Sequence, residues 1–429
     1  MIGAGYVGLV SGVCFSDCGF EVICADIDAQ KIASLKNGEI PIYEPGLQDL
    51  VKRNLAENRL KFSTNIASAV ESADAIFLAV GTPSRPGGGE ADLSFLFAGV
   101  KAAAPHFKQG VVIVTKSTVV VSTNQRIREL IESERPDLDF SVVSNPEFLR
   151  EGSAINDFME PDRVVVGVHD ERGREAMEVL YAPLNLAEGR FVVTNLENAE
   201  LIKYASNAFL AMKVTFINEV ANLCEMAGGD VTEVAHAIGL DERVGPKFLS
   251  AGPGIGGSCF PKDTRAFAAT GIKYRAPQRL IETVIQVNEA RKIYMADRIL
   301  DVFDKPINKT ACVLGIAFKP ETDDVREAPG LTIIPRLIEN GMKVRAYDPQ
   351  AMTNGREVLE DVTWCSSVVE AASSADILVV LTEWDEFKSL DLKAVSGVMA
   401  GDIVFDTRNI YDEVQFGAAG LKLMSVGRG

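Results

Sequence analysis

Short apolar runs alternate with helical patterns in the first and last thirds of the chain. Such runs, bounded by turn signals, are typical of buried strands. In the first third they cover residues 21–25, 75–80, 111–116 and 140–144. In the last third they cover residues 311–314, 343–347, 377–382 and 403–406. Because helical segments separate the runs, the pattern predicts parallel βαβ units and a doubly wound sheet at each end of the chain.

The middle of the chain has a helical period instead. Residues 198–227 form one long helical pattern that ends at two glycines, and a second pattern covers residues 278–303. The predicted fold class is α/β, with two Rossmann-like doubly wound parallel-sheet domains joined by a helical central region that contains a long helix. The predicted domains are 1–197, 198–305 and 306–429, which suits the two or three domains expected of 429 residues.

The chain is acidic, with 43 Lys and Arg residues against 60 Asp and Glu residues and a formal charge of −17. Such a surface repels a phosphate backbone, which argues against nucleic acid as a partner. No apolar run approaches the roughly 20 residues of a membrane span and no signal peptide is evident, so we expect a cytoplasmic protein without a membrane partner. The seven cysteines lack C-x-x-C spacing and there are only three histidines, which argues against a disulfide scaffold and a metal site.

A glycine-rich segment opens the chain. GAGYVG at residues 3–8 matches G-x-G-x-x-G, in which Gly3, Gly5 and Gly8 allow a tight turn and a close approach of a pyrophosphate to a helix N-terminus. Asp26 ends the next predicted strand, where an acid can bind the adenosine ribose and repel the extra phosphate of NADP. We therefore favour NAD binding over a purely structural turn, although the nearby Lys31 weakens the preference over NADP. Only two residues precede Gly3, too few for a full first strand, so we expect the natural chain to begin further upstream.

The segment NPEFLRE at residues 145–151 follows a predicted strand, at the sheet edge where doubly wound folds bind ligands. Glu147 and Glu151 are four residues apart, so a helical turn would place them on one face. Arg150 lies between them. A structural ion pair is therefore the alternative to a role in binding a ligand.

The long central helix carries a polar stripe. At about 100° per residue, Lys203, Asn207 and Asn218 fall within about 60° of one another. A largely opposite face carries three apolar residues, Phe209, Phe216 and Val220. Lys and Asn one turn apart on so apolar a helix indicate a polar site, because burying them unpaired is costly. The alternative is a solvated strip on an amphipathic helix.

The most specific segment is GPGIGGSCFPKD at residues 252–263. Its glycines let a loop approach a ligand closely. Cys259 precedes a predicted helix start and Lys262 lies nearby, and both a helix N-terminus and a cation favour the nucleophilic thiolate form of cysteine. Asp263 can orient water or accept a proton. An inert buried cysteine is the alternative, but it would not explain the glycines beside a lysine and an aspartate.

In the last third, three cations follow predicted strands, where the phosphates of a ligand would lie. They are Lys319, Arg326 and Arg408. The alternative is that each is held in a salt bridge. The G-x-G-x-x-G pattern is missing here, so we do not expect a second dinucleotide.

Together these segments resemble the UDP-glucose/GDP-mannose dehydrogenase family over essentially the whole chain. The matching stretches are GAGYVGL, GTP at 81–83, KSTV at 116–119, NPEFLREG, GGSCFPKD, AFKPETDDVRE and DTRN. The resemblance implies an NAD-binding N-terminal domain, a C-terminal domain that helps to bind a UDP-sugar, and a homodimer supported by the long helix. The implied reaction oxidises the C6 alcohol of UDP-glucose to a carboxylate with two NAD, through a thiohemiacetal and a thioester on Cys259.

The resemblance also implies roles for individual residues and no metal. Catalytic roles fall to Cys259, Lys203, Asn207, Asp263, Thr118 and Glu147. NAD contacts fall to Gly3, Gly5, Tyr6, Val7, Gly8, Asp26, Lys31, Thr82, Thr118, Glu151, Lys262 and Arg326. Contacts with the nucleotide sugar fall to Phe148, Leu149, Arg150, Glu151, Lys203, Asn207, Phe248, Leu249, Ser250, Ala251, Gly252, Gly256, Lys319 and Arg408, with Arg243 reaching the substrate of the neighbouring subunit.

Three alternatives stay open from the residues. One is a relative that oxidises GDP-mannose or a UDP-N-acetylhexosamine, since Ile255 stands where many relatives have an aromatic residue. Another is an NAD-binding regulatory protein without turnover, which would need neither Cys259 nor Lys203. The third is a two-electron hydroxyacid dehydrogenase, which would not need Cys259.

Overall fold

The computed structural model describes residues 1–85 and 89–429. The chain forms two compact units, which we describe separately. The first unit comprises Met1–Ser206 and Ala266–Pro277, and the second comprises Asn207–Arg265 and Gln278–Gly429. Two helices run across these boundaries, α9 (Leu196–Ala227) and α11 (Phe260–Lys273). Within the described residues, no helix is both long enough and apolar enough to cross a membrane.

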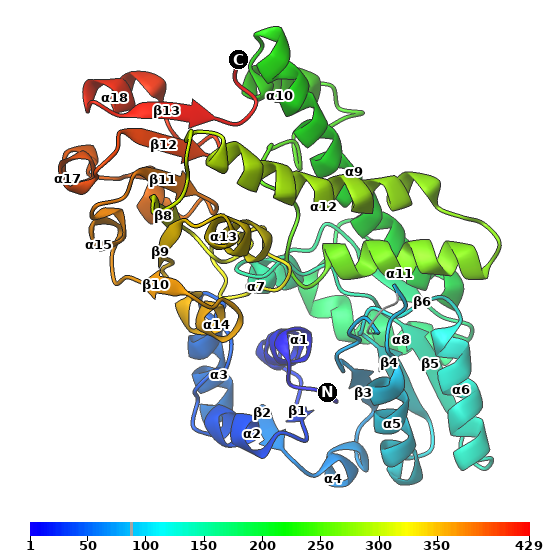
Figure 1. The fold of residues 1–429 in the computed structure, drawn as a ribbon. Helices are drawn as coiled ribbons and strands as arrows, with labels where there is room; N and C mark the ends of the chain where they lie inside the picture. The colour runs from blue at the N-terminus through cyan, green and yellow to red at the C-terminus, as the bar shows by residue number, and fades with distance from the viewer. Residues whose placement is uncertain (86–88) are drawn as a thin grey trace. The chain divides into compact units, whose positions relative to one another are not determined.

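The first unit is built on parallel strands (Figure 1). Strands β3, β4, β5, β6 and β7 pair in that order, while β1 pairs with β2. Ile2 joins the two groups, because it bridges Ala25 of β1 on one side and Leu78 of β3 on the other. These strand pairs are parallel except β5 and β6, which are joined by an antiparallel bridge between Ser144 and Gly167. The strands are β1 (Val22–Ala25), β2 (Leu60–Ser63), β3 (Ala75–Leu78), β4 (Val111–Thr115), β5 (Phe140–Ser144), β6 (Val164–Gly167) and β7 (Phe191–Thr194).

Helices cover both faces of this sheet, as the doubly wound prediction requires. Alternate strand residues enter separate cores: Phe77 packs with α1 and α3, whereas its neighbours Ile76 and Leu78 pack with α5 and α6. Because both faces of the sheet are covered, successive strand residues are buried on opposite sides and nearly every strand position is apolar. The helices are α1 (Tyr6–Asp17), α2 (Ala29–Lys36), α3 (Leu47–Ala56), α4 (Ile66–Val70), α5 (Ser94–Ala103), α6 (Thr123–Glu134), α7 (Ala154–Met159) and α8 (Glu171–Tyr181).

The second unit contains a six-stranded parallel sheet in the order β10-β9-β8-β11-β12-β13 (Figure 1, yellow to red). Its strands are β8 (Thr310–Leu314), β9 (Lys343–Tyr347), β10 (Val362–Trp364), β11 (Ile377–Val380), β12 (Ile403–Asp406) and β13 (Lys422–Ser425). Its helices are α10 (Val231–Gly239), α12 (Arg279–Leu300), α13 (Gly330–Glu339), α14 (Met352–Val358), α15 (Val368–Ala372), α16 (Asp385–Lys388), α17 (Leu392–Val398) and α18 (Glu413–Ala418). The predicted α/β class with a long central helix is confirmed.

All eight predicted strands are present, but five further strands were missed. Four of the five, β2, β7, β10 and β13, hold polar or partly exposed positions, and among these four only β7, which reads FVVT, has three apolar residues in a row. The exception is β6, which is fully buried and reads VVVG. The other four strands are short and lie at the edges of their sheets, which explains why their sequence patterns are weak.

Candidate functional site

In the first unit, a glycine turn precedes α1. Gly3 has φ +96°, and a Cβ there would lie 2.6 Å from the carbonyl oxygen of Ala79, so only glycine fits. Gly5 precedes the first turn of α1 and has open space around it. The first amides of a helix have no partner within the helix, so a glycine turn with open space at a helix start is an arrangement that can bind a pyrophosphate.

Asp26, at the end of β1, is held next to this turn. Its Oδ2 accepts hydrogen bonds from the Ala4 amide at 2.8 Å and from Lys31 Nζ at 3.2 Å, and its Oδ1 accepts one from the Asp28 amide at 3.0 Å. Burial alone would raise the pKa of Asp26, but these hydrogen bonds outweigh it and the pKa lies below its ordinary value. The carboxylate keeps 12% of its surface exposed, so it can still accept a ribose hydroxyl. The residues present therefore fit a dinucleotide.

A similar glycine turn follows the first strand of the second sheet, but the acid beside it is not exposed. Gly315 has φ +91° and follows β8, and Asp348, at the end of β9, accepts hydrogen bonds from the Ile316 and Ala317 amides at 2.7 and 3.0 Å. Its carboxylate also accepts from the Trp384 indole, and the residue is fully buried. Because no surface of Asp348 reaches a ligand, the second turn cannot hold a ribose as Asp26 can.

Tyr6 and Glu44 tie the glycine turn to the segment after β5. The Tyr6 hydroxyl donates to Glu44, and the Gly152 and Ala154 amides donate to the Glu44 carboxylate at 2.7 and 2.8 Å. Burial raises the pKa of Tyr6 far above its ordinary range, and the hydrogen bond to Glu44 raises it further. Glu44 is buried and was not identified from the sequence. Val7, in the first turn of α1, is partly exposed.

The KSTV segment follows β4 at the carboxyl edge of the sheet. Thr82 donates its hydroxyl to the backbone carbonyl of Thr118 at 2.8 Å, which holds the loops after β3 and β4 together. Lys116 is buried and donates to Asn145 Oδ1 and to the Tyr181 hydroxyl, each at 3.0 Å. Burial lowers the pKa of Lys116 to about 8, although the nearby Glu147 opposes the shift.

Glu147 and Lys203 form a buried ion pair in the first unit. Lys203 Nζ lies 3.1 Å from Glu147 Oε1, and each side chain is only 4% exposed. The ring of Phe148 lies between two cations, 5.2 Å from Lys203 Nζ and 3.8 Å from the Arg163 guanidinium carbon. Lys203 is therefore not on a solvated strip. Arg163 is a neighbour that the sequence analysis missed.

The expectation of a helical turn in the NPEFLRE segment is wrong. Residues 145–150 form an irregular loop, so Glu147 and Glu151 do not share a helix face. Glu147 Oε2 instead accepts the amide of Leu149 at 2.6 Å. Arg150 pairs with Asp157 at 2.5 Å, because α7 brings that carboxylate back to the loop. The ion pair considered between Arg150 and the two glutamates is therefore not formed.

In the second unit, Cys259 immediately precedes α11. Its carbonyl accepts the Asp263 amide at 2.8 Å in the first helical turn, and the Ser258 hydroxyl lies 3.5 Å from its Sγ. Cys259 is partly exposed, whereas five of the other six cysteines are buried. Asp263 is fully buried, and it accepts from Asn207 Nδ2 at 2.7 Å and from Lys262 Nζ at 2.5 Å. A thiol, a carboxylate, an amide and an ammonium therefore surround one helix start.

The glycine-rich loop before Cys259 is held by polar side chains of α9 and α12. Asn218 accepts the Gly252 amide at 2.8 Å, and Arg291 donates to the Gly252 carbonyl at 2.5 Å. Asn288 accepts the Ile255 amide at 2.7 Å. A Cβ on Gly256 would lie 2.7 Å from the Glu327 carbonyl oxygen, so this glycine allows two backbone segments to touch. Asn288 and Arg291 were not identified from the sequence.

The cations of the second unit differ in their surroundings. Arg408 is mostly buried, pairs with Glu383 at 3.1 Å and donates to the carbonyls of Leu381 and Phe318. Arg326 pairs with Asp324 at 2.8 Å, with 65% of its side chain exposed. The salt-bridge alternative thus describes part of the environment of both arginines.

The other predicted sugar contacts of the second unit lie in three places: at Lys319, in the loop 248–252 and at Arg243. The Lys319 ammonium lies 5.7 Å from the Phe318 ring centroid. In the loop 248–252, Phe248 has φ +65° and Leu249, Ala251 and Gly252 are buried, whereas Ser250 is exposed. Arg243 is 88% exposed and pairs with Asp241. An arginine that extends so far into solvent is available to another molecule.

Comparisons with known proteins cover the whole chain. Residues 1–185 match the UDP-glucose/GDP-mannose dehydrogenase family, NAD binding domain; residues 197–290 match the central domain of that family, and residues 312–413 its UDP binding domain. The chain is 48% identical to UDP-glucose 6-dehydrogenase of Rhizobium meliloti (strain 1021), over 100% of this chain and 99% of the relative.

Solved structures give the same result. A UDP-glucose dehydrogenase from Pyrobaculum islandicum has 37% identity and a TM-score of 0.88, over 95% of this chain and 93% of that one. A UDP-D-ManNAc dehydrogenase from Pyrococcus horikoshii has 26% identity and a TM-score of 0.87, over 100% and 98%. The glycine turn at Gly3, the acid at Asp26 and the full-length matches agree: the chain is an NAD-dependent oxidoreductase that belongs to the UDP-glucose/GDP-mannose dehydrogenase family.

Proposed function

We propose that this chain oxidises UDP-glucose at C6 to UDP-glucuronate by a four-electron reaction on Cys259. The observation that carries the proposal is the partly exposed Cys259 at the start of α11, near the buried Asp263 and Asn207 and the partly exposed Lys262. The relatives named above support the choice of sugar, because identity is 48% and 37% to proteins named for UDP-glucose but 26% to the one named for UDP-D-ManNAc.

Two hydride transfers are needed, and NAD supplies that chemistry by accepting a hydride from the C6 carbon in each. In the first oxidation, a side chain that acts as a general base takes the proton of the C6 hydroxyl as the hydride leaves C6, which gives the aldehyde. The Cys259 thiolate then adds to the aldehyde carbon and forms a thiohemiacetal, which holds the aldehyde on the protein. The second oxidation of that carbon gives a thioester.

Hydrolysis completes the cycle. Water adds to the thioester carbon, the C–S bond breaks, and the carboxylate and the Cys259 thiolate are released. We assign Lys203 and Asn207 to stabilise the negative oxygen that forms at C6, since an ammonium and an amide are suitable donors. We assign Thr118, Glu147 and Asp263 to orient water and transfer protons. Lys203 is already paired with Glu147, and Asn207 with Asp263, so each donor is held beside a carboxylate that can take a proton.

The remaining predicted contacts complete the proposal. We propose that NAD contacts Gly3, Gly5, Tyr6, Val7, Gly8, Asp26, Lys31, Thr82, Thr118, Glu151, Lys262 and Arg326. We propose that the UDP-sugar contacts residues 148–151, 248–252, Lys203, Asn207, Gly256, Lys319 and Arg408, with Arg243 serving a neighbouring subunit. We retain the domain division 1–197, 198–305 and 306–429. A cytoplasmic location is supported by the seven cysteines, none of which forms a disulfide among the described residues.

We propose a homodimer through α9. Phe209, Phe216 and Leu223 recur every seven residues on that helix and are 57%, 53% and 67% exposed. A row of large apolar side chains of this kind is typical of a surface that another protein covers. Sedimentation velocity should give twice the 46.3 kDa chain mass for the wild type, and Phe216→Glu should give the monomer. A monomeric wild type would contradict the homodimer.

The function is tested by a screen of nucleotide sugars with NADH absorbance as the readout. We expect the highest kcat/KM with UDP-glucose, two NADH per sugar and no free aldehyde. A higher kcat/KM with GDP-mannose or a UDP-N-acetylhexosamine would show that this nucleotide sugar, and not UDP-glucose, is the substrate. One NADH per sugar, with aldehyde accumulating, would contradict the four-electron reaction, and NAD binding without turnover on any sugar would favour the regulatory alternative.

A further inference from the structure

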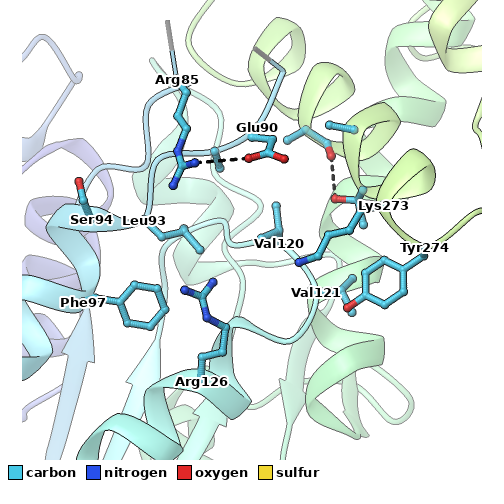
Figure 2. A pocket seen from close by; sticks show the side chains of 14 residues that line it. Arg85, Glu90, Leu93, Ser94, Phe97, Val120, Val121, Arg126, Lys273 and Tyr274 are labelled. Carbon is cyan, nitrogen blue, oxygen red and sulfur yellow. Dashed lines mark hydrogen bonds and ion pairs between the residues drawn. The ribbon is translucent and has the colours of Figure 1, made fainter.

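None of the residues that line one pocket of the first unit is assigned to the reaction. Its volume is about 350 Å³. Figure 2 shows its walls: the loop after β3 carries Arg85, the start of α5 carries Phe97, the loop before α6 carries Val120, and the second half of α11 carries Lys273. The loops after β3 and β4 leave the carboxyl ends of neighbouring parallel strands, the edge where doubly wound sheets bind ligands.

Two cations in this pocket have no carboxylate partner. The Arg126 guanidinium carbon lies 4.4 Å from the Phe97 ring centroid, and Lys273 Nζ lies 5.7 Å from the Tyr274 ring centroid. Neither forms an ion pair with any residue that the structure describes. The third cation, Arg85, pairs with Glu90 at 3.5 Å, and both are more than half exposed, so that pair is weak. The lining therefore has a positive balance in a chain of charge −17.

The shape and walls of the pocket limit the class of ligand. A bare phosphate needs far less than 350 Å³, whereas pockets of roughly 300 Å³ and above hold small organic ligands. Leu93, Val120, Ala266 and Ala269 supply apolar wall beside the cations. In Figure 2 the Arg126 guanidinium points into the pocket beside Phe97, and a planar guanidinium both binds phosphate and stacks on flat rings.

We propose that this pocket binds a nucleoside monophosphate, with the phosphate between Arg126 and Lys273 and the base against the apolar wall. The bound nucleotide also contacts Val120 and Val121, which follow Thr118 in the same loop. Glu200 and Tyr274 already hold the far end of that loop, through the Ser122 amide and the Ser122 hydroxyl, each at 2.8 Å. Because these hydrogen bonds restrain the loop at Ser122, a ligand in the pocket acts on a loop with little conformational freedom. The regulatory consequence rests on the proposed role of Thr118, but the binding itself does not.

The test measures binding without turnover. The full-length protein is saturated with NAD and UDP, so that the sites assigned above are occupied and no sugar is present to react. Adenosine monophosphate is then titrated by calorimetry, with inorganic phosphate in a parallel experiment. We expect one further site per chain for adenosine monophosphate and at least about tenfold weaker binding of phosphate, because phosphate lacks the base.

Variants separate this pocket from other cations. Arg126→Gln and Lys273→Gln should each weaken the binding of adenosine monophosphate by at least about tenfold, the scale of a lost charge-assisted hydrogen bond. The matched control is Arg128→Gln on the same helix, whose guanidinium pairs with Glu132 at 2.8 Å and does not line the pocket; its affinity should be unchanged. Unchanged NAD affinity in all three variants shows that they fold.

Three results would overturn the proposal: no further site in the wild type, unchanged affinity in both pocket variants, or phosphate that binds as tightly as the nucleotide. Failure of UDP-glucose oxidation would leave this measurement untouched, so the two ideas fail independently.

Discussion

Glu200 of α9 holds Asn124 at two points: its Oε1 accepts hydrogen bonds from the Asn124 amide at 2.9 Å and from the Asn124 side-chain nitrogen at 2.8 Å. Its Oε2 accepts the Ser122 amide at 2.8 Å. The carboxylate thus satisfies the first amides of α6 and holds the loop that begins with Thr118. Burial raises the pKa of Glu200 to about 7 despite these hydrogen bonds, and the negative charge of Glu197 raises it slightly further.

This shift makes stability depend on pH. Because the folded pKa lies above the ordinary value of about 4.5, the folded protein holds a proton that the unfolded chain has lost between those two values. The free energy of unfolding should therefore fall as pH rises from about 4.5 to 7, by up to about 3 kcal/mol. In Glu200→Gln this dependence should disappear, as measured by urea unfolding at pH 5 and pH 8. Glu197→Gln, an exposed neighbour on the same helix, should keep it; equal slopes in wild type and Glu200→Gln would contradict the assignment.

The buried pair of Glu147 and Lys203 gives a second prediction, through a double-mutant cycle. Lys203→Met leaves a buried carboxylate without its cation, so the free energy of unfolding should fall by about 3 kcal/mol or more. Adding Glu147→Gln removes that unpaired charge and should restore much of the stability. Turnover should stay low in the double variant, because the ammonium assigned to the negative oxygen is absent. Stability loss that simply adds between the two variants would show that the pair is not coupled.

Cys259 gives a third prediction, which separates catalysis from cofactor binding. In Cys259→Ser the hydroxyl is a far weaker nucleophile at neutral pH, so acid production should fall by at least about a hundredfold. NAD affinity should survive, because the proposed contacts with the dinucleotide are mainly at Gly3–Gly8 and Asp26, in another segment of the chain. Cys24→Ala is the internal control: this thiol is fully buried, and burial raises its pKa to about 11, so its loss should affect stability only. Wild-type turnover in Cys259→Ser would rule out the covalent mechanism.

Local sequence signals predicted much of the fold and several candidate residues. The turn at Gly3, the acid at Asp26 and the helix start after Cys259 each depend on residues close together in the chain. Glu44 was missed because its partner Gly152 is 108 positions away, and Glu200 because Asn124 is 76 positions away. Asn288 and Arg291 on α12 read as part of the polar face of an amphipathic helix, although both are buried against the glycine loop. No local sequence pattern distinguishes a polar residue that holds a distant loop from one that is exposed to solvent.

Asp26 gives the last prediction, on the choice of dinucleotide. We have proposed that its carboxylate binds the adenosine ribose, in which case the extra phosphate of NADP would meet like charge there. Lys31 is paired with the same carboxylate at 3.2 Å, so it offsets the charge of Asp26 only in part and is not free to attract that phosphate. We therefore expect a higher kcat/KM with NAD than with NADP.

Asp26→Asn keeps an oxygen for the Ala4 amide but removes the charge, and the preference for NAD should fall by at least about tenfold. Asp28→Asn is the control, since Asp28 caps α2 through the Gln30 and Lys31 amides; the ratio of the two kcat/KM values should stay close to wild type there. A wild-type protein that prefers NADP would show that Lys31, and not Asp26, decides the selectivity.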